Sequence, residues 1–213
     1  MTTRDRASLA VVITLLALSG RATAQVSARG DSSSATELQA GYGRLSQDVI
    51  TLRLRSGTLE VRLVPLEEPL LRLLAPDAYQ SLHLLLQSQR KHIDSIAASR
   101  GIHDPGLALV SFHAMAPATR FDPAVLTVSL RGQQYRPIGT VPLSPMFSNQ
   151  QLDVREQASG LFIYERQLPI LEPFTVTYLD GSNDEWERRL SRLETERSRI
   201  LGRTRSRSDS IKP

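Results

Sequence analysis

The sequence predicts an α+β fold, mainly β: an antiparallel β-sandwich with an N-terminal β-hairpin, one amphipathic mid-chain helix and a C-terminal helix. Hydrophobic and polar residues alternate in short segments over residues 50–63 and again from 107 to 179, which is the period of strands. Residues 77–101 and 182–202 repeat their hydrophobic residues with the period of a helix. The 213 residues are 40% hydrophobic and include no cysteine, so an apolar core rather than disulfides must stabilise the fold.

The N-terminus has the features of a secretory signal peptide. Arg4 and Arg6 precede the uncharged apolar run Leu9–Leu18, and Ala22-Thr23-Ala24 supplies the small residues that signal peptidase accepts. The run is shorter than the roughly 20 residues that a membrane span needs, although an uncleaved anchor is the alternative. We expect cleavage after Ala24 and a protein that is exported, either periplasmic or secreted.

Residues 25–48 are rich in Ser, Gly, Ala and Gln and predict a flexible lead-in. They contain Arg29-Gly30-Asp31, which resembles the cell-attachment tripeptide of adhesion proteins. The formal net charge of +4 lies at the two ends, with +2 in residues 1–24, +3 in residues 203–213 and −1 in residues 25–202. A nearly neutral body argues against a groove dedicated to nucleic acid.

The hairpin comes first among the expected elements. Ile50, Leu52 and Leu54 alternate with polar residues, and so do Leu59, Val61 and Leu63 after Ser56-Gly57. A two-residue turn at Ser56-Gly57 pairs 54 with 59, 52 with 61 and 50 with 63. This register places Arg53 opposite Glu60 as a favourable cross-strand charge pair. Whether the hairpin joins the later sheet or forms a subdomain with the first helix stays open.

Residues 65–75, broken by Pro65 and Pro69, predict an irregular bridge to the mid-chain helix. Asp77 is the expected cap of that helix, and Gly101 its end. Residues 102–181 follow as the antiparallel sandwich. Its expected strands are Leu107–Ala114, Val125–Leu130, Gln133–Ile138, Gln151–Arg155, Leu161–Glu165 and Phe174–Leu179. Arg131-Gly132 predicts a two-residue turn, and Leu161–Glu165, apolar on both faces, predicts an interior strand.

The last expected helix covers residues 182–202. Ser182 and Glu185 form a capping box, and a narrow stripe of Trp186, Leu190, Leu193 and Ile200 predicts that one edge packs on the body or on another chain. Residues 203–213 predict a disordered basic tail. Its Arg203, Arg205 and Arg207 are candidates for binding an anionic polymer.

The sandwich segment also resembles a known type of module. Phe121-Asp122-Pro123, Leu126–Leu130, Tyr135-Arg136-Pro137, Gly160–Glu165 and Phe174–Tyr178 are similar to immunoglobulin-like sandwich modules of bacterial exported proteins. The resemblance implies binding or presentation rather than catalysis. It covers about a third of the chain and lacks the Cys–Trp–Cys core of antibody domains, so it implies the architecture alone.

Candidate catalytic and metal-binding residues do not form a recognised motif. His83 and His92 share a helix but point to opposite faces, and His103 and His113 meet only through tertiary folding. Asp180–Asp184 resembles the start of a calcium loop, but Glu185 and Ser191 stand where such a loop needs Gly and Glu. Glu67-Glu68 is a poor acid–base pair, and nothing selects Asp122 or Glu165 as catalytic. We therefore expect no metal and no cofactor.

The sequence thus favours an exported, non-enzymatic binding or interaction module of the cell envelope that recognises a protein or another envelope component. One alternative is an exported hydrolase whose site assembles from distant loops. The other is tethering to a polyanion through the basic tail.

Overall fold

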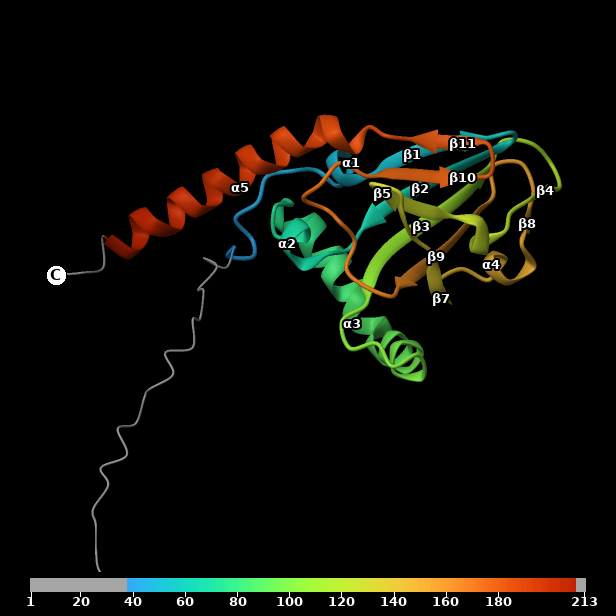
Figure 1. Ribbon diagram of the computed structural model, residues 1–213, viewed down its shortest axis with the longest axis horizontal. Coiled ribbons are helices and arrows are strands. Elements are labelled where there is room, and N and C mark those ends of the chain that lie inside the picture. The colour runs from blue at the N-terminus through green and yellow to red at the C-terminus, as the bar shows by residue number, and fades with distance from the viewer. Residues whose placement is uncertain (1–37, 210–213) are drawn as a thin grey trace, which may run out of the picture. The chain divides into compact units, whose positions relative to one another are not determined.

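The computed structural model describes residues 38–209 (Figure 1). The expected signal peptide, the Arg29-Gly30-Asp31 tripeptide, most of the lead-in and residues 210–213 lie outside the described residues. The described chain is α+β, with one five-stranded, one four-stranded and one two-stranded antiparallel sheet.

The five-stranded sheet has the order β1-β2-β3-β9-β7. Its strands are β1 (Leu52–Ser56), β2 (Leu59–Pro65), β3 (Gly106–Ala114), β9 (Gln157–Tyr164) and β7 (Pro137–Pro142). The hairpin therefore belongs to the later sheet, because every residue of β2 is paired with β3. Segments 49–101 and 102–181 therefore contribute strands to the same sheet. As predicted, the strand that contains Leu161 lies inside the sheet, although it begins earlier, at Gln157.

The predicted register of the hairpin is wrong by two residues. Leu54 pairs with Val61 and Ser56 with Leu59, so the turn residues are Gly57 and Thr58. Gly57 has φ +53°, and glycine at the first turn position is what a type II′ turn requires. The shift places Arg53 opposite Arg62 rather than Glu60, while Glu60 lies opposite Arg55. Ile50 is in the short helix α1 (Gln47–Ile50) and not in a strand.

The four-stranded sheet has the order β11-β10-β5-β6. It comprises β11 (Gly181–Asn183), β10 (Thr175–Tyr178), β5 (Thr127–Leu130) and β6 (Gln133–Tyr135). The predicted turn between β5 and β6 is confirmed, with positive φ at both Arg131 (49°) and Gly132 (81°), as in a type I′ turn. The predicted strand Gln133–Ile138 is in fact two strands in different sheets, divided at Arg136.

The two larger sheets also meet at their other edge, where β11 lies against β1. The Asn183 side chain donates a hydrogen bond to the Arg53 carbonyl (2.7 Å). Gly181 allows this approach, because a Cβ there would lie 2.4 Å from the Arg55 carbonyl oxygen. The sheets are therefore connected at one edge by Arg136 and in contact at the other.

The remaining elements are short. Strands β4 (Thr119–Arg120) and β8 (Gln151–Leu152) pair with each other, so the predicted strand Gln151–Arg155 is only two residues long. Helices α2 (Glu68–Leu71) and α4 (Met146–Asn149) and the 3-10 helix Pro123–Val125 lie in connections.

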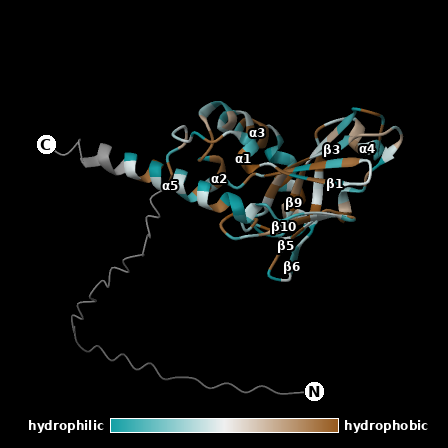
Figure 2. Ribbon diagram, turned by 90° about the horizontal axis from the view of Figure 1, so that it is seen from above, coloured by the Kyte–Doolittle hydropathy of each residue, from teal (hydrophilic) through white to brown (hydrophobic). Residues whose placement is uncertain are grey.

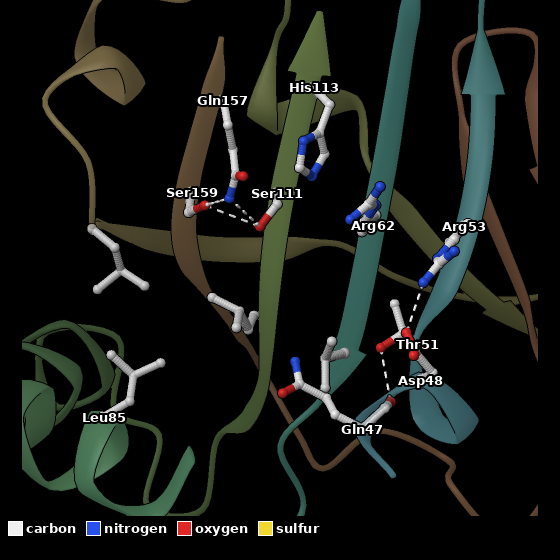
Figure 3. Close-up of a pocket in the computed structure, with 13 residues that line it drawn as sticks. Gln47, Asp48, Thr51, Arg53, Arg62, Leu85, Ser111, His113, Gln157 and Ser159 are labelled. Carbon is white, nitrogen blue, oxygen red and sulfur yellow. Dashed lines mark hydrogen bonds and ion pairs between the residues drawn. The ribbon is translucent and has the colours of Figure 1, made fainter. Parts of the chain in front are cut away.

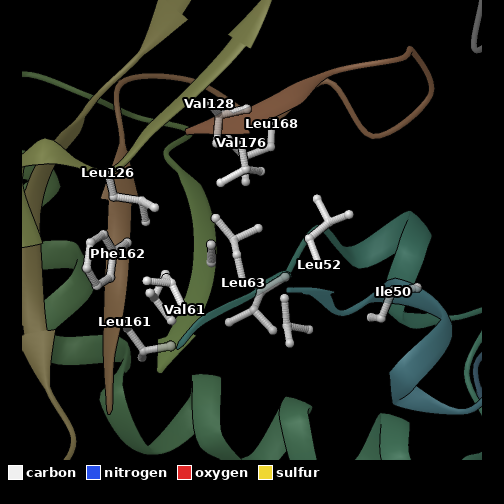
Figure 4. Packing of buried hydrophobic residues seen from close by; sticks show 14 of the residues in the cluster. Ile50, Leu52, Val61, Leu63, Leu126, Val128, Leu161, Phe162, Leu168 and Val176 are labelled. Atoms are coloured by element: carbon white, nitrogen blue, oxygen red, sulfur yellow. The ribbon is translucent and has the colours of Figure 1, made fainter. Parts of the chain in front are cut away.

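The core fills the space between the inner faces of the two larger sheets and continues onto the outer face of the five-stranded sheet at Leu161 (Figure 4). Phe112 of β3 is its aromatic centre, with ring centroids 4.5 Å from Phe121, 5.6 Å from Tyr178 and 6.2 Å from Phe162. Leucine and valine side chains fill the rest, among them Leu63 and Val176, each with no exposed surface. Burial of this apolar surface is the main stabilising contribution.

Helix α3 (Pro76–Ser99) covers part of the outer face of the five-stranded sheet. Asp77 is not its cap: Ala75 is, and Pro76 is at the first helical position, where its missing N–H costs nothing. The predicted end at Gly101 is confirmed. The Gly101 N–H donates to Ala98 (3.0 Å) and the Ile102 N–H to Ala97 (2.9 Å), which is a Schellman motif.

Helix α5 (Trp186–Asp209) starts and ends later than predicted. Ser182 lies in β11, and the Asn183 side chain accepts the Glu185 N–H (2.9 Å) in place of the expected capping box. Residues 203–209 are helical, contrary to the expected disorder. The predicted stripe does pack on the body: Trp186, Leu193 and Ile200 are buried, and the Trp186 indole donates to Ile170 (3.0 Å).

Hydrophilic residues recur along the coloured part of α5 (Figure 2). Among the described residues, none of the helices combines the length and the hydropathy of a membrane span.

Two buried tyrosines provide a matched test of this core. The Tyr164 hydroxyl is fully buried and has no hydrogen-bond partner within residues 38–209, whereas the Tyr178 hydroxyl accepts the Asp122 N–H (2.9 Å). We expect Tyr164→Phe to keep or raise the free energy of unfolding by up to about 1 kcal/mol, because it removes an unsatisfied polar group. Tyr178→Phe should lower it by about 1 kcal/mol. Urea denaturation measures both, and an equal loss in the two variants would contradict the assignment.

Candidate functional site: a groove on the outer face of the sheet

The outer face of the five-stranded sheet carries three rows of side chains that run across the strands. The row farthest from α3 is Arg55, Glu60, His113 and Gln157, and the next is Arg53, Arg62, Ser111 and Ser159. The third, Val64, Leu109, Leu161 and Val141, is apolar. Helix α3 covers the apolar end, where Ile96 occupies the space that a Cβ on Gly139 would need. The two polar rows lie beyond the helix.

A groove of about 600 Å³ lies where the polar rows, α3 and α1 meet (Figure 3). Strands β1, β2, β3 and β9 form its floor. One wall is formed by α3, and the other is formed by α1 and Thr51. It is lined by Gln47, Asp48, Thr51, Arg53, Arg62, Val64, Leu85, Leu109, Ser111, His113, Leu143, Gln157 and Ser159.

The cationic side of the groove is formed by Arg53 and Arg62, which lie directly opposite each other on β1 and β2. Like charges in this position repel, and two carboxylates offset the repulsion. Asp48 accepts a hydrogen bond from Arg53 (2.7 Å), and Glu60 accepts one from Arg62 (2.7 Å). The hydrogen bond from Arg62, with the charges of Arg62 and Arg55, lowers the pKa of Glu60, so this carboxylate is ionised at neutral pH.

His113 is partly buried beside the arginines. Its Nε2 atom is buried and has no hydrogen-bond partner among the described residues. Burial lowers the pKa of His113, and the charges of Arg62 and Arg53 lower it further. The ring is therefore neutral at neutral pH, with one nitrogen as donor and the other as acceptor. The His113 side chain lines the groove, but its Nε2 atom itself is covered.

Three uncharged polar groups continue the floor. The Ser111 and Ser159 hydroxyls lie 3.0 Å apart, and the Gln157 amide donates to Ser159 (2.7 Å) and Ser111 (3.4 Å). These contacts hold the two hydroxyls to each other and to Gln157 (Figure 3).

The side of the groove toward α3 is apolar. Val64 and Leu109 come from the third row of the sheet, Leu85 from α3 and Leu143 from the segment after β7. In Figure 3, Leu85 lies on the opposite side of the groove from Arg53 and Arg62. The groove therefore has one cationic and one aliphatic side.

The other residues considered from the sequence lie elsewhere. Of the four histidines only His113 lines the groove: His83 stacks on Tyr79, with 5.3 Å between centroids, and His92 and His103 are exposed. No three His, Asp or Glu residues within 38–209 are placed to hold a metal ion. In the segment Asp180–Asp184, Asp180 is in the turn after β10, the next three residues form β11 and Asp184 precedes α5. The Asp122 carboxylate accepts the Ala124 N–H (2.9 Å).

The sequence analysis did not predict the groove. It did identify two of its parts, the charged face of the hairpin and the expected strand that contains His113. The pairing of β2 with β3 and of β3 with β9 is what brings Arg62, Ser111 and Ser159 into one row.

No protein-family model, no characterised protein and no solved structure matches this chain. A functional assignment therefore depends on the groove and its chemistry.

Glu67 is the most strongly perturbed carboxylate among the described residues. It is 7% exposed and accepts the N–H groups of Leu168 (2.9 Å) and Leu107 (3.4 Å), whereas Glu68 points to Arg72 and Tyr79. Burial raises the pKa of Glu67 to about 7, and the charge of Asp104 adds to the effect. Glu67 and Glu68 thus face different partners.

The raised pKa of Glu67 predicts a loss of stability with rising pH. Its folded pKa of about 7 exceeds the ordinary glutamate pKa of 4.5, so its contribution to stability is complete below pH 4.5 and is lost as the pH rises through 7. The loss is roughly 3 kcal/mol. Glu67→Gln keeps an acceptor for both N–H groups and should abolish this slope, whereas Glu68→Gln should retain it. Urea unfolding from pH 4 to 8 measures the effect; a slope that persists in Glu67→Gln would refute it.

Proposed function

We propose that the chain is an exported, non-enzymatic binding module of the cell envelope whose groove holds a small amphipathic ligand with an anionic head. The observation that carries the proposal is the division of the groove: the arginine pair of Arg53 and Arg62 on one side, and Leu85, Leu109 and Val64 on the other.

Size and chemistry both support a small ligand. A volume of about 600 Å³ is in the range of sites for small molecules, which combine apolar walls with a few polar groups. Two guanidinium groups recognise a carboxylate or phosphate through charge-assisted hydrogen bonds. The hydroxyls of Ser111 and Ser159 supply further hydrogen bonds beside the arginines.

The contacts of the serines favour binding over hydrolysis. A serine nucleophile needs a base within about 2.6–3.2 Å of its hydroxyl. Ser111 and Ser159 instead contact each other and Gln157, and the Nε2 atom of His113 has no partner in the described chain. The groove therefore offers recognition groups, and the hydrolase is the weaker alternative.

The proposal includes the immunoglobulin-like architecture of residues 107–179. Two antiparallel sheets around a shared core are consistent with a sandwich module. The immunoglobulin-like character itself stays a prediction from the sequence resemblance. Binding modules of this type present a rigid surface, which agrees with a groove built on four strands.

Export is tested by the mass of the mature protein. Expressed in a bacterial host, the chain should be recovered outside the cytoplasm with Gln25 as its first residue, because the small residue at Ala24 permits cleavage. Intact mass spectrometry measures this. The control Ala24→Arg should retain the precursor. Recovery of the unaltered chain with Met1 in the membrane fraction would contradict cleavage and favour an anchor.

The groove is tested with two probes that share a chain and differ in charge, decanoate and decylamine. Decanoate should bind in isothermal titration calorimetry and decylamine should not. Arg53→Ala and Arg62→Ala should each weaken decanoate binding by about tenfold, since each removes a charge-assisted hydrogen bond.

Arg55→Ala is the matched control, because Arg55 lies on the same strand and face as Arg53 but outside the groove. Equal affinity for both probes, or equal loss in the control, would overturn the proposed ligand class.

A further inference from the structure

A second pocket, of about 430 Å³, lies at the C-terminal end of α3. Three arginines from three parts of the fold line it. Arg100 caps the end of α3, Arg136 connects β6 with β7, and Arg166 follows β9. Tyr135, Gln134 and Glu165 are also in its lining. Residues far apart in the sequence thus place three cations around one cavity.

These arginines differ from most others in the described chain in having no counter-ion. Arg53, Arg62, Arg131 and Arg189 each form an ion pair with a carboxylate, at distances of 2.7–3.1 Å. Within residues 38–209, none of Arg100, Arg136 and Arg166 forms one, Glu165 in the same pocket included. Their charge is therefore not neutralised by contact with the protein.

Two of the three guanidinium groups are held in place by uncharged neighbours. Arg166 lies over the Tyr135 ring, 5.2 Å from its centroid, which is a cation–π contact. With the amide oxygen of Gln133 facing it, Arg166 also donates to that oxygen through Nη1 (2.9 Å). Arg136 donates to the Gln134 amide oxygen (3.1 Å). These contacts leave other N–H groups of each guanidinium available, since arginine has five.

We propose that this pocket binds a tetrahedral oxyanion of the phosphate class. A planar carboxylate is satisfied by one guanidinium fork, whereas a phosphate group accepts hydrogen bonds from several directions at once. The three arginines come from a helix end, a strand connection and the segment after β9, and donors in such different places suit a phosphate group. The site is distinct from the groove and does not depend on its ligand.

Glu165 sets the charge balance of the pocket. It is exposed and carries a negative charge that opposes an anion, so it reduces the attraction of the three arginines. Substitution of this carboxylate should therefore change the affinity for an anion in the opposite direction from substitution of an arginine. Glu165→Gln should tighten anion binding, whereas loss of an arginine should weaken it.

The test is a titration of the chain from Gln25 to Pro213 with inorganic phosphate, followed by the NMR signals of the arginine Nε–H groups. Saturable shifts are expected for the pocket arginines. Arg136→Ala and Arg166→Ala should each weaken binding by about tenfold, and Glu165→Gln should strengthen it. Arg120→Ala, an exposed arginine on β4 outside the pocket, is the matched control and should change nothing.

Two further experiments distinguish a lipid headgroup from free phosphate and test whether the basic tail accounts for the binding. Flotation with phosphatidic acid vesicles, beside phosphatidylcholine vesicles, distinguishes a lipid headgroup from free phosphate; binding in either arm that the pocket variants reduce supports the site. The triple variant Arg203→Ala, Arg205→Ala, Arg207→Ala should bind like the unaltered chain. The proposal is overturned by absence of saturation with both probes, or by equal losses in the Arg120→Ala or tail variants.

Discussion

Strand β3 is covered differently on its two faces, and the rest of the structure depends on this difference. Its inner face carries Phe112, whose ring contacts aromatic side chains from both sheets and the loops. Its outer face carries Leu109 at one end and Ser111 and His113 at the other. Because side chains alternate along a strand, the same nine residues complete the core and supply the floor of the groove.

Helix α3 converts this outer face into a surface with sites. It lies over the apolar end of the face, where Ile96 contacts Gly139, and ends its coverage before the polar rows begin. One side of the helix then forms a wall of the groove through Leu85, and its C-terminal end brings Arg100 to the second pocket. A helix that covered the whole face would leave no room for the groove, so partial coverage is the condition for the first proposal.

Local patterns predicted the elements well and their relations poorly. The alternation in β3 and the glycine at 101 were sufficient because each acts through neighbouring residues. Alternation cannot detect a register shift of two residues, because each side chain stays on its own face after such a shift. The expected pair of Arg53 with Glu60 is therefore replaced by the pair of Arg53 with Arg62.

The groove was missed because it requires the pairing of four strands. The cap of α5 was missed because both candidates lie in β11: Ser182 is on its exposed face, whereas the side chain of Asn183, the last residue of the strand, accepts the Glu185 N–H.

The corrected register also explains why the groove suits an anion. Pairing Arg53 with Arg62 is unfavourable for the sheet by itself, and the fold offsets it with Asp48 and Glu60 rather than avoiding it. The two carboxylates differ in position: Glu60 lies in the row between Arg55 and His113, whereas Asp48 is on the short helix α1 and reaches Arg53 from the groove wall. An anionic head in the groove thus competes with Asp48 for Arg53, while Arg62 stays paired with Glu60. The cost of displacing one exposed ion pair is small, about 0–1 kcal/mol, which keeps the arginine pair available to a ligand.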